Sequence, residues 1–80
     1  MRMFFLPAND PGIPDGSISP REREIVTLVA DGYSNKLMAH KLGITVKTVE
    51  THRREAKRKL GVRSTAHLIR YAILAGLVSP

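Results

Sequence analysis

The sequence predicts an all-α domain of four helices, with a helix-turn-helix motif at about residues 35–54 and an irregular arm before the first helix. Three observations lead to this prediction. Apolar residues recur at helical spacing from residue 19 onward, and the period-two alternation of strands is absent. Four Ser or Thr residues precede segments of helical length, and each segment ends near a glycine. Ala39 and Gly43 have the spacing of a small helix residue and a turn residue that adopts positive φ.

The first helix is expected to begin after Ser19, with Pro20 in its first position. Glu22 completes a Ser-x-x-Glu capping box, in which two side chains bond reciprocally to backbone N–H groups. Gly32 is expected to end the helix. The apolar residues of its inward face are expected to be Ile25, Leu28 and Val29.

The second and third helices form the predicted helix-turn-helix. Ser34 caps the second helix and Gly43 ends it, whereas Thr45 caps the third and Gly61 ends it near residue 60. The apolar residues expected to face the core from these two helices are Met38, Ala39, Leu42, Val46, Val49, Ala56 and Leu60.

The fourth helix is expected to begin after Ser64 and to stop at Gly76. Leu77 and Val78 are expected to fold back and close the core. The residues of this helix expected to point inward are Leu68, Ile69 and Ala72.

Length and composition limit the function classes. Eighty residues form one small domain, here residues 18–80, and a net charge of +6 favours a polyanionic partner such as nucleic acid. No cysteine is present, so disulfides and thiolate zinc sites are excluded. No apolar stretch approaches the ~20 residues of a membrane span, and the short apolar run after Arg2 is below the length of a signal sequence. A cytoplasmic protein without a membrane association is expected.

Residues 1–17 are expected to be an irregular arm or linker, because several Pro, Gly, Asn and Asp residues interrupt any periodicity. Three interpretations remain open. The segment is a disordered tail, or it docks Phe4, Phe5 and Leu6 on this domain or on a second copy, or it is the remnant of an upstream domain.

The third helix carries the candidate functional residues on its outward stripe. An α-helix fits the major groove of duplex DNA and reads bases with residues of its first turns. The side chains expected to read bases are Glu50, Thr51 and Arg54. The side chains expected to contact the DNA backbone are Thr45, Lys47, Thr48, Arg53, Lys57 and Arg58. The alternative is a solvated charged face with pairs such as Glu50 with Arg54.

Glu50 is the unusual member of this group, because phosphates repel a carboxylate. It either adds discrimination between bases or orients Arg53 or Arg54, and the sequence leaves both interpretations open. His52 is expected to be a half-buried packing residue. Neither a metal site nor a cofactor is expected, because the three histidines lack a ligand spacing with a second donor. No nucleophile with an orienting base and no Gly-rich phosphate loop is present, so an enzyme is not expected.

The motifs together resemble the LuxR-type, or GerE-like, helix-turn-helix domain over about residues 18–78. The matching strings are SPRERE at 19–24, GYSNK at 32–36, GIT at 43–45, KTVETH at 47–52, KLGVRS at 59–64 and AGL at 75–77. Within the family, the sequence is most similar to the output domains of FixJ- and NarL-like response regulators.

The resemblance implies a sequence-specific bacterial transcription regulator that binds double-stranded DNA through its third helix and takes no small-molecule ligand in this chain. It also implies a homodimer on an inverted repeat and recruitment or blocking of RNA polymerase. Family members commonly dimerise through the fourth helix. The residues expected at that interface are Leu68, Tyr71, Ile73 and Leu74. Most family members carry an upstream receiver or sensor domain, so the chain is either a stand-alone regulator or an effector domain.

Four residues depart from the family pattern: Leu37, Ala56, Thr65 and Leu74. Leu37 replaces an acidic residue and Leu74 a polar one, and both are expected on outer faces. They support a second hypothesis, in which a helix-turn-helix-shaped module binds another regulator instead of DNA. The seven Lys and Arg between Lys47 and Arg63, against two Glu, favour DNA.

Overall fold

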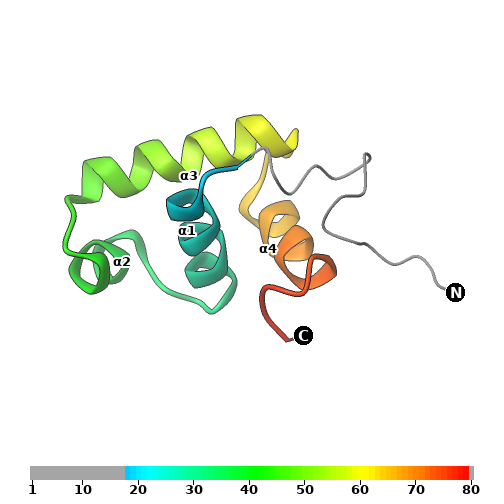
Figure 1. The fold of residues 1–80 in the computed structure, drawn as a ribbon, viewed down its shortest axis with the longest axis horizontal. Helices are drawn as coiled ribbons and strands as arrows, with labels where there is room; N and C mark the ends of the chain where they lie inside the picture. The colour runs from blue at the N-terminus through cyan, green and yellow to red at the C-terminus, as the bar shows by residue number, and fades with distance from the viewer. Residues whose placement is uncertain (1–17, 80) are drawn as a thin grey trace, which may run out of the picture.

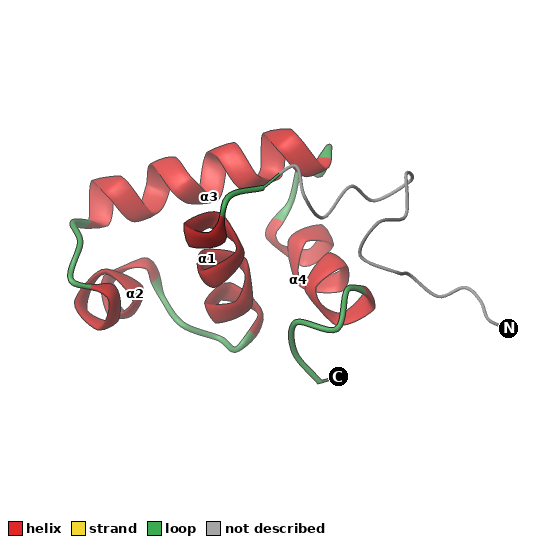
Figure 2. Ribbon diagram, in the orientation of Figure 1, coloured by secondary structure: helices red, strands yellow, loops and turns green. Residues whose placement is uncertain are grey.

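The computed structural model describes residues 18–79, which form four helices joined by short loops (Figures 1 and 2). The helices are α1 (Pro20–Ala30), α2 (Asn35–Leu42), α3 (Val46–Leu60) and α4 (Thr65–Leu74). No strand occurs within residues 18–79, and the predicted all-α fold is confirmed. The expectations for residues 1–17 lie outside the described residues. Within the described range, every helix is too short or too polar to cross a membrane.

Each helix begins at the residue that the sequence predicts, because a hydroxyl caps each first turn. Ser19, Ser34, Thr45 and Ser64 have extended backbones, and each side chain accepts from the N–H group three residues later. The capping box of α1 is complete: Glu22 N donates to Ser19 Oγ at 3.0 Å, and Ser19 N donates to Glu22 Oε1 at 2.9 Å. These bonds satisfy N–H groups that the helices themselves leave without partners.

The turn of the helix-turn-helix is closed by backbone geometry. Gly43 adopts φ 69° and ψ 33°, the left-handed conformation expected of it. Ile44 N then donates to Ala39 O at 3.0 Å, which bonds the turn back to α2. Since Ala39 is buried, its small side chain lets α2 approach the rest of the domain closely.

The core lies around α1, which packs against both α3 and α4, while α2 packs mainly against α3. In Figure 1, α3 extends along one side of the molecule and the other three helices lie on its inner side. The most deeply buried side chains are Ile25, Val26, Met38, Val49, Ala56, Leu68 and Ala72. Leu77 and Val78 pack against this core after α4, as predicted, and Leu77 N donates to Ala72 O at 2.8 Å.

The core differs from the prediction at two residues. Val46 was expected to point inward, but 39% of it is exposed at the first residue of α3, directly after the turn. Val26 was not expected in the core, but it is fully buried. With Ile25 and Val29 it forms a broad inward face on α1, because α3 and α4 cover this helix from two directions.

Candidate nucleic-acid interface

The outward face of α3 is the most basic surface that a single helix presents in the described part of the chain. Residues 46–60 contain six Lys or Arg and two Glu, whereas the opposite face buries Val49 and Ala56 completely. One side of α3 is therefore fixed in the core and the other is available to a partner (Figure 1). A helix of 15 residues is about 22 Å long and projects sufficiently to enter a major groove.

The predicted base-reading residues lie on this outward face. Glu50 and Arg54 are exposed and lie one turn apart, and Thr51 is half-buried between them along the helix. The Thr51 hydroxyl donates to Lys47 O at 3.1 Å. Since this bond occupies the hydroxyl proton, the methyl group is the part of Thr51 that remains for an apolar contact.

The first turn of α3 combines N–H groups with a lysine. Thr45 Oγ1 accepts from Thr48 N at 3.1 Å and lies 2.9 Å from Thr48 Oγ1. The cap thus satisfies one N–H of the first turn, and those of Val46 and Lys47 remain outside the helix ladder. The positive end of the helix dipole and the exposed Lys47 ammonium make this turn suitable for a phosphate.

Two of the side chains predicted to contact the DNA backbone, Lys57 and Arg58, lie in the second half of α3. Arg58 donates to Glu55 Oε1 through both Nε and Nη2, at 3.0 and 2.7 Å. This bond raises the pKa of Arg58 and lowers the pKa of Glu55. This ion pair is exposed and contributes little to stability, so Arg58 can exchange Glu55 for a phosphate oxygen at little cost. Lys57 is half-buried.

Arg53 lies in a position that the sequence did not predict. Its Nη1 donates to Asn35 Oδ1 at 2.8 Å, and its Nη2 donates to Thr65 Oγ1 at 2.7 Å. The side chain therefore contacts two other helices instead of extending freely toward solvent. No sequence signal indicates this contact, since the partners are 18 and 12 residues away.

The far end of α3 is fixed by an ion pair with α1. Lys59 Nζ lies 3.0 Å from Glu22 Oε1, and the carboxylate is buried. Burial acts to raise the pKa of Glu22, but the hydrogen bonds from Ser19 and Lys59 and the charges of Lys59 and His52 outweigh it, and the pKa is lowered. The expected capping role of Glu22 is confirmed, and its ion pair with Lys59 adds a link between α1 and α3.

The structure corrects part of the dimer interface predicted on α4. Leu68 and Tyr71 belong to the core, with 0% and 5% of their surfaces exposed, so neither offers area to a second copy. They point inward because α4 packs on α1 along the stripe that contains them and Ala72. Ile73 is half-buried and Leu74 is 56% exposed, so these two residues remain as the outer apolar surface.

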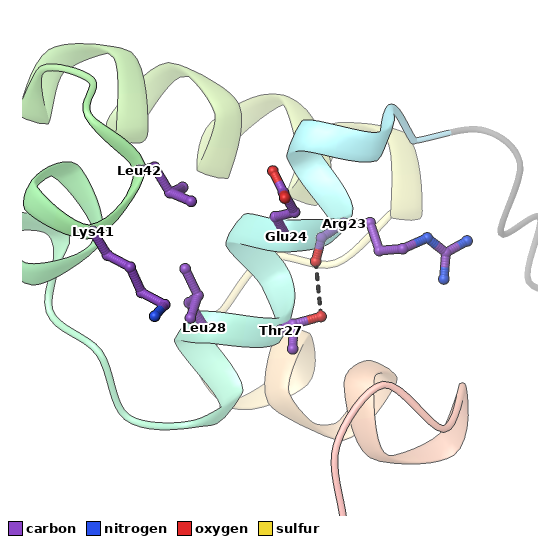
Figure 3. Close-up of a pocket in the computed structure, with 6 residues that line it drawn as sticks. All are labelled: Arg23, Glu24, Thr27, Leu28, Lys41 and Leu42. Carbon is purple, nitrogen blue, oxygen red and sulfur yellow. Dashed lines mark hydrogen bonds between the residues drawn. The ribbon is translucent and has the colours of Figure 1, made fainter.

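A shallow groove of about 240 Å³ lies between α1 and α2, away from the outward face of α3. Figure 3 shows Leu28 of α1 and Leu42 of α2 pointing toward each other across it, with the Lys41 side chain beside them. Lys41 Nζ also lies 5.9 Å from the centre of the Tyr33 ring, within range of a cation–π contact. The groove contains no residue of α3, so it is distinct from the candidate DNA-binding surface.

The model of the LuxR family of bacterial regulatory proteins, GerE, matches residues 16–72. The chain belongs to this family, and the predicted resemblance is confirmed. Over 69 residues it is 52% identical to the transcriptional regulatory protein MctR of Rhizobium johnstonii, which covers 84% of this chain and 32% of MctR. Over 66 residues it is 44% identical to the oxygen regulatory protein NreC of Staphylococcus carnosus, which covers 82% of this chain and 30% of NreC.

Solved structures of the response regulator RcsB of Salmonella typhimurium have the same fold. One matches with a TM-score of 0.70 at 33% identity over 79% of this chain and 31% of RcsB. A second matches with a TM-score of 0.65 at 35% identity over 68% of this chain and 26% of RcsB. The chain spans about a third of the length of the curated relatives it matches. Fold, family and basic helix define its class: a DNA-binding helix-turn-helix domain of transcription regulators.

Proposed function

We propose that this chain binds duplex DNA sequence-specifically by placing α3 in the major groove, as part of a cytoplasmic bacterial transcription regulator without catalytic activity. One observation carries the proposal. The helix buries Val49 and Ala56 completely and exposes Lys47, Glu50 and Arg54 along the opposite face. A face of this kind, fixed by the left-handed turn at Gly43, suits base readout from a rigid element.

The contacts divide by chemistry. Arg54 bonds guanine through its guanidinium fork, Glu50 accepts from a cytosine amino group, and the Thr51 methyl contacts thymine. The side chains that hold phosphates are Thr45, Lys47, Thr48, Lys57 and Arg58. Arg58 is recruited from its exposed pair with Glu55, because such pairs contribute little in water.

We further propose that two copies bind an inverted repeat and meet through α4. The exposed Leu74, with the half-buried Ile73 beside it, supplies the apolar centre of the contact. A symmetric interface repeats the same residues on both copies, so a short apolar patch is doubled. The similarity to the transcriptional regulatory protein MctR, and to the response regulator RcsB in a structure that concerns DNA interaction, supports DNA-directed regulation. Contact with RNA polymerase is part of the same proposal.

A protein-interaction module is the second candidate, because Leu37 on α2 is 57% exposed and Leu74 on α4 is 56% exposed.

The dependence of DNA affinity on salt distinguishes the DNA-binding domain from the protein-interaction module. A fluorescently labelled random 30-base-pair duplex is titrated with the chain at several KCl concentrations. DNA binding predicts that log K falls by about 0.9 per decade of salt for each phosphate neutralised. Absence of salt-dependent binding by the folded chain would contradict the proposal.

A further inference from the structure

We propose that Arg53 is a positioning residue that holds α3 at the correct orientation for DNA by bonding to the first residues of α2 and α4. The inference rests on the proposed function, since it explains how the reading helix is held. It replaces the expectation from sequence that Arg53 contacts the DNA backbone.

The geometry places one guanidinium between three helices. Arg53 lies near the middle of α3, Asn35 is the first residue of α2 and Thr65 is the first residue of α4. The two bonds, 2.8 and 2.7 Å, have the length of charge-assisted hydrogen bonds. Both are part-buried, so water competes with them less than at an exposed site.

Arginine is suited to this role in a way that lysine is not. Its planar fork directs two nitrogens at two separate acceptors, whereas a lysine ammonium is a point charge on a flexible stem. Asn35 and Thr65 are neutral acceptors, and both bonds of the guanidinium are within the protein.

The packing gives the contact a specific consequence. The main interfaces join α1 to α3, α1 to α4 and α2 to α3, so α4 is held chiefly by α1. The bond from Arg53 to Thr65 links α3 directly to α4. Since Arg54 follows Arg53 by 100° around the helix, fixing Arg53 on the inner side keeps Arg54 directed outward. Displacements of an ångström at such a site reduce the quality of base contacts.

The experiment measures duplex affinity and its salt dependence for variants of the full 80-residue chain, each shown by circular dichroism to be folded at the assay temperature. The variants are Arg53→Ala, Arg53→Lys and the double variant Asn35→Ala with Thr65→Val. Thr65→Ser keeps the acceptor hydroxyl. Thr27→Val is the matched control, because it removes a threonine hydroxyl bonded to Arg23 O at 2.9 Å, on a helix that does not bond Arg53.

Positioning predicts that Arg53→Ala, Arg53→Lys and the double variant each bind about tenfold more weakly than the wild type, with an unchanged salt slope. Thr65→Ser and Thr27→Val bind as the wild type does. The proposal is overturned if Arg53→Lys keeps full affinity, if Arg53→Ala lowers the salt slope by about one, or if the double variant binds normally. If Arg53→Ala does not fold, Arg53→Lys and the double variant decide. Failure of the wild type itself to bind duplex DNA would instead refute the proposed function.

Discussion

Lys59 Nζ donates to both oxygens of Glu22, at 3.0 and 3.1 Å, across 37 residues of sequence. The pair joins the last turn of α3 to the first turn of α1. The same carboxylate accepts from Ser19 N, so one side chain both caps α1 and fixes α3. A single buried acid therefore fixes the last turn of α3 against the first turn of α1.

We expect Glu22→Gln to destabilise the domain by about 1–2 kcal/mol, because a charged hydrogen bond becomes a neutral one while the capping geometry is kept. Glu22→Ala should cost more, since the capping box is also lost. Urea unfolding followed by circular dichroism measures both. Glu24→Gln is the control: Glu24 pairs with Arg21 in a 3.1 Å bridge that is largely exposed, and its loss should change stability by less than about 0.5 kcal/mol. Equal effects at both positions would contradict the assigned role.

The contribution of Glu22 to the unfolding free energy should also depend on pH. The pKa of Glu22 is lowered from 4.5 in the folded chain, so its contribution is present above pH 4.5 and is lost as the pH falls through the folded value. The difference in unfolding free energy between the wild type and Glu22→Gln should thus be constant near pH 7 and shrink below about pH 5. Urea midpoints between pH 7 and pH 3 test this. A difference that grows toward acid would show the opposite sign of the pKa shift.

The helix-turn-helix turn gives a prediction about backbone strain. Gly43 adopts φ 69°, and a Cβ added there would meet no atom within 4 Å. The cost of Gly43→Ala is therefore conformational, about 1–2 kcal/mol. Gly43→Asn should cost less, because asparagine tolerates the left-handed region better. Thermal unfolding of the two variants compares them, and equal losses would contradict this account.

Lys47 and Arg54 should respond differently to substitution. Lys47→Ala is expected to weaken binding to all duplexes about equally and to lower the salt slope by about one, because it removes a phosphate contact. Arg54→Ala is expected to lose about 1–3 kcal/mol at one base position and to relax preference there. Anisotropy titrations with matched and mismatched duplexes measure both. If the two variants behave alike, the division into phosphate and base contacts is wrong.

The outer surface of α4 gives the last of these predictions. Leu74→Glu should weaken dimers on a palindromic duplex and leave the monomer folded, because Leu74 is 56% exposed. Leu37→Glu is the matched control, since Leu37 is 57% exposed on another helix. Sedimentation velocity with and without the duplex measures the stoichiometry. An unchanged two-to-one complex in Leu74→Glu would exclude this patch.

The ends of the helices could be predicted from the sequence, because each end depends on residues only a few positions away. Ser19, Ser34, Thr45 and Ser64 each cap a helix through an N–H group three residues away, and Gly43 ends α2 through its own φ. Such features need no knowledge of the fold.

Contacts between helices were predicted less well. Leu68 was expected both in the core and at a dimer interface, and Tyr71 at the interface alone, because the spacing along α4 does not reveal that α1 covers the stripe containing both residues. Arg53 belongs to a charged helix, and its bonds to Asn35 and Thr65 depend on how three helices meet. Outward Glu50 and Arg54 could be predicted from periodicity alone, because their positions follow from the helix itself.

The most direct test of the central proposal is selection of the 80-residue chain and its Arg54→Ala variant against a random duplex library at about physiological salt. The account predicts that the wild type enriches an inverted repeat and that Arg54→Ala enriches a motif degenerate at one position in each half-site. If the folded wild type enriches no sequence, or if Arg54→Ala enriches the same motif unchanged, α3 does not read DNA through this face.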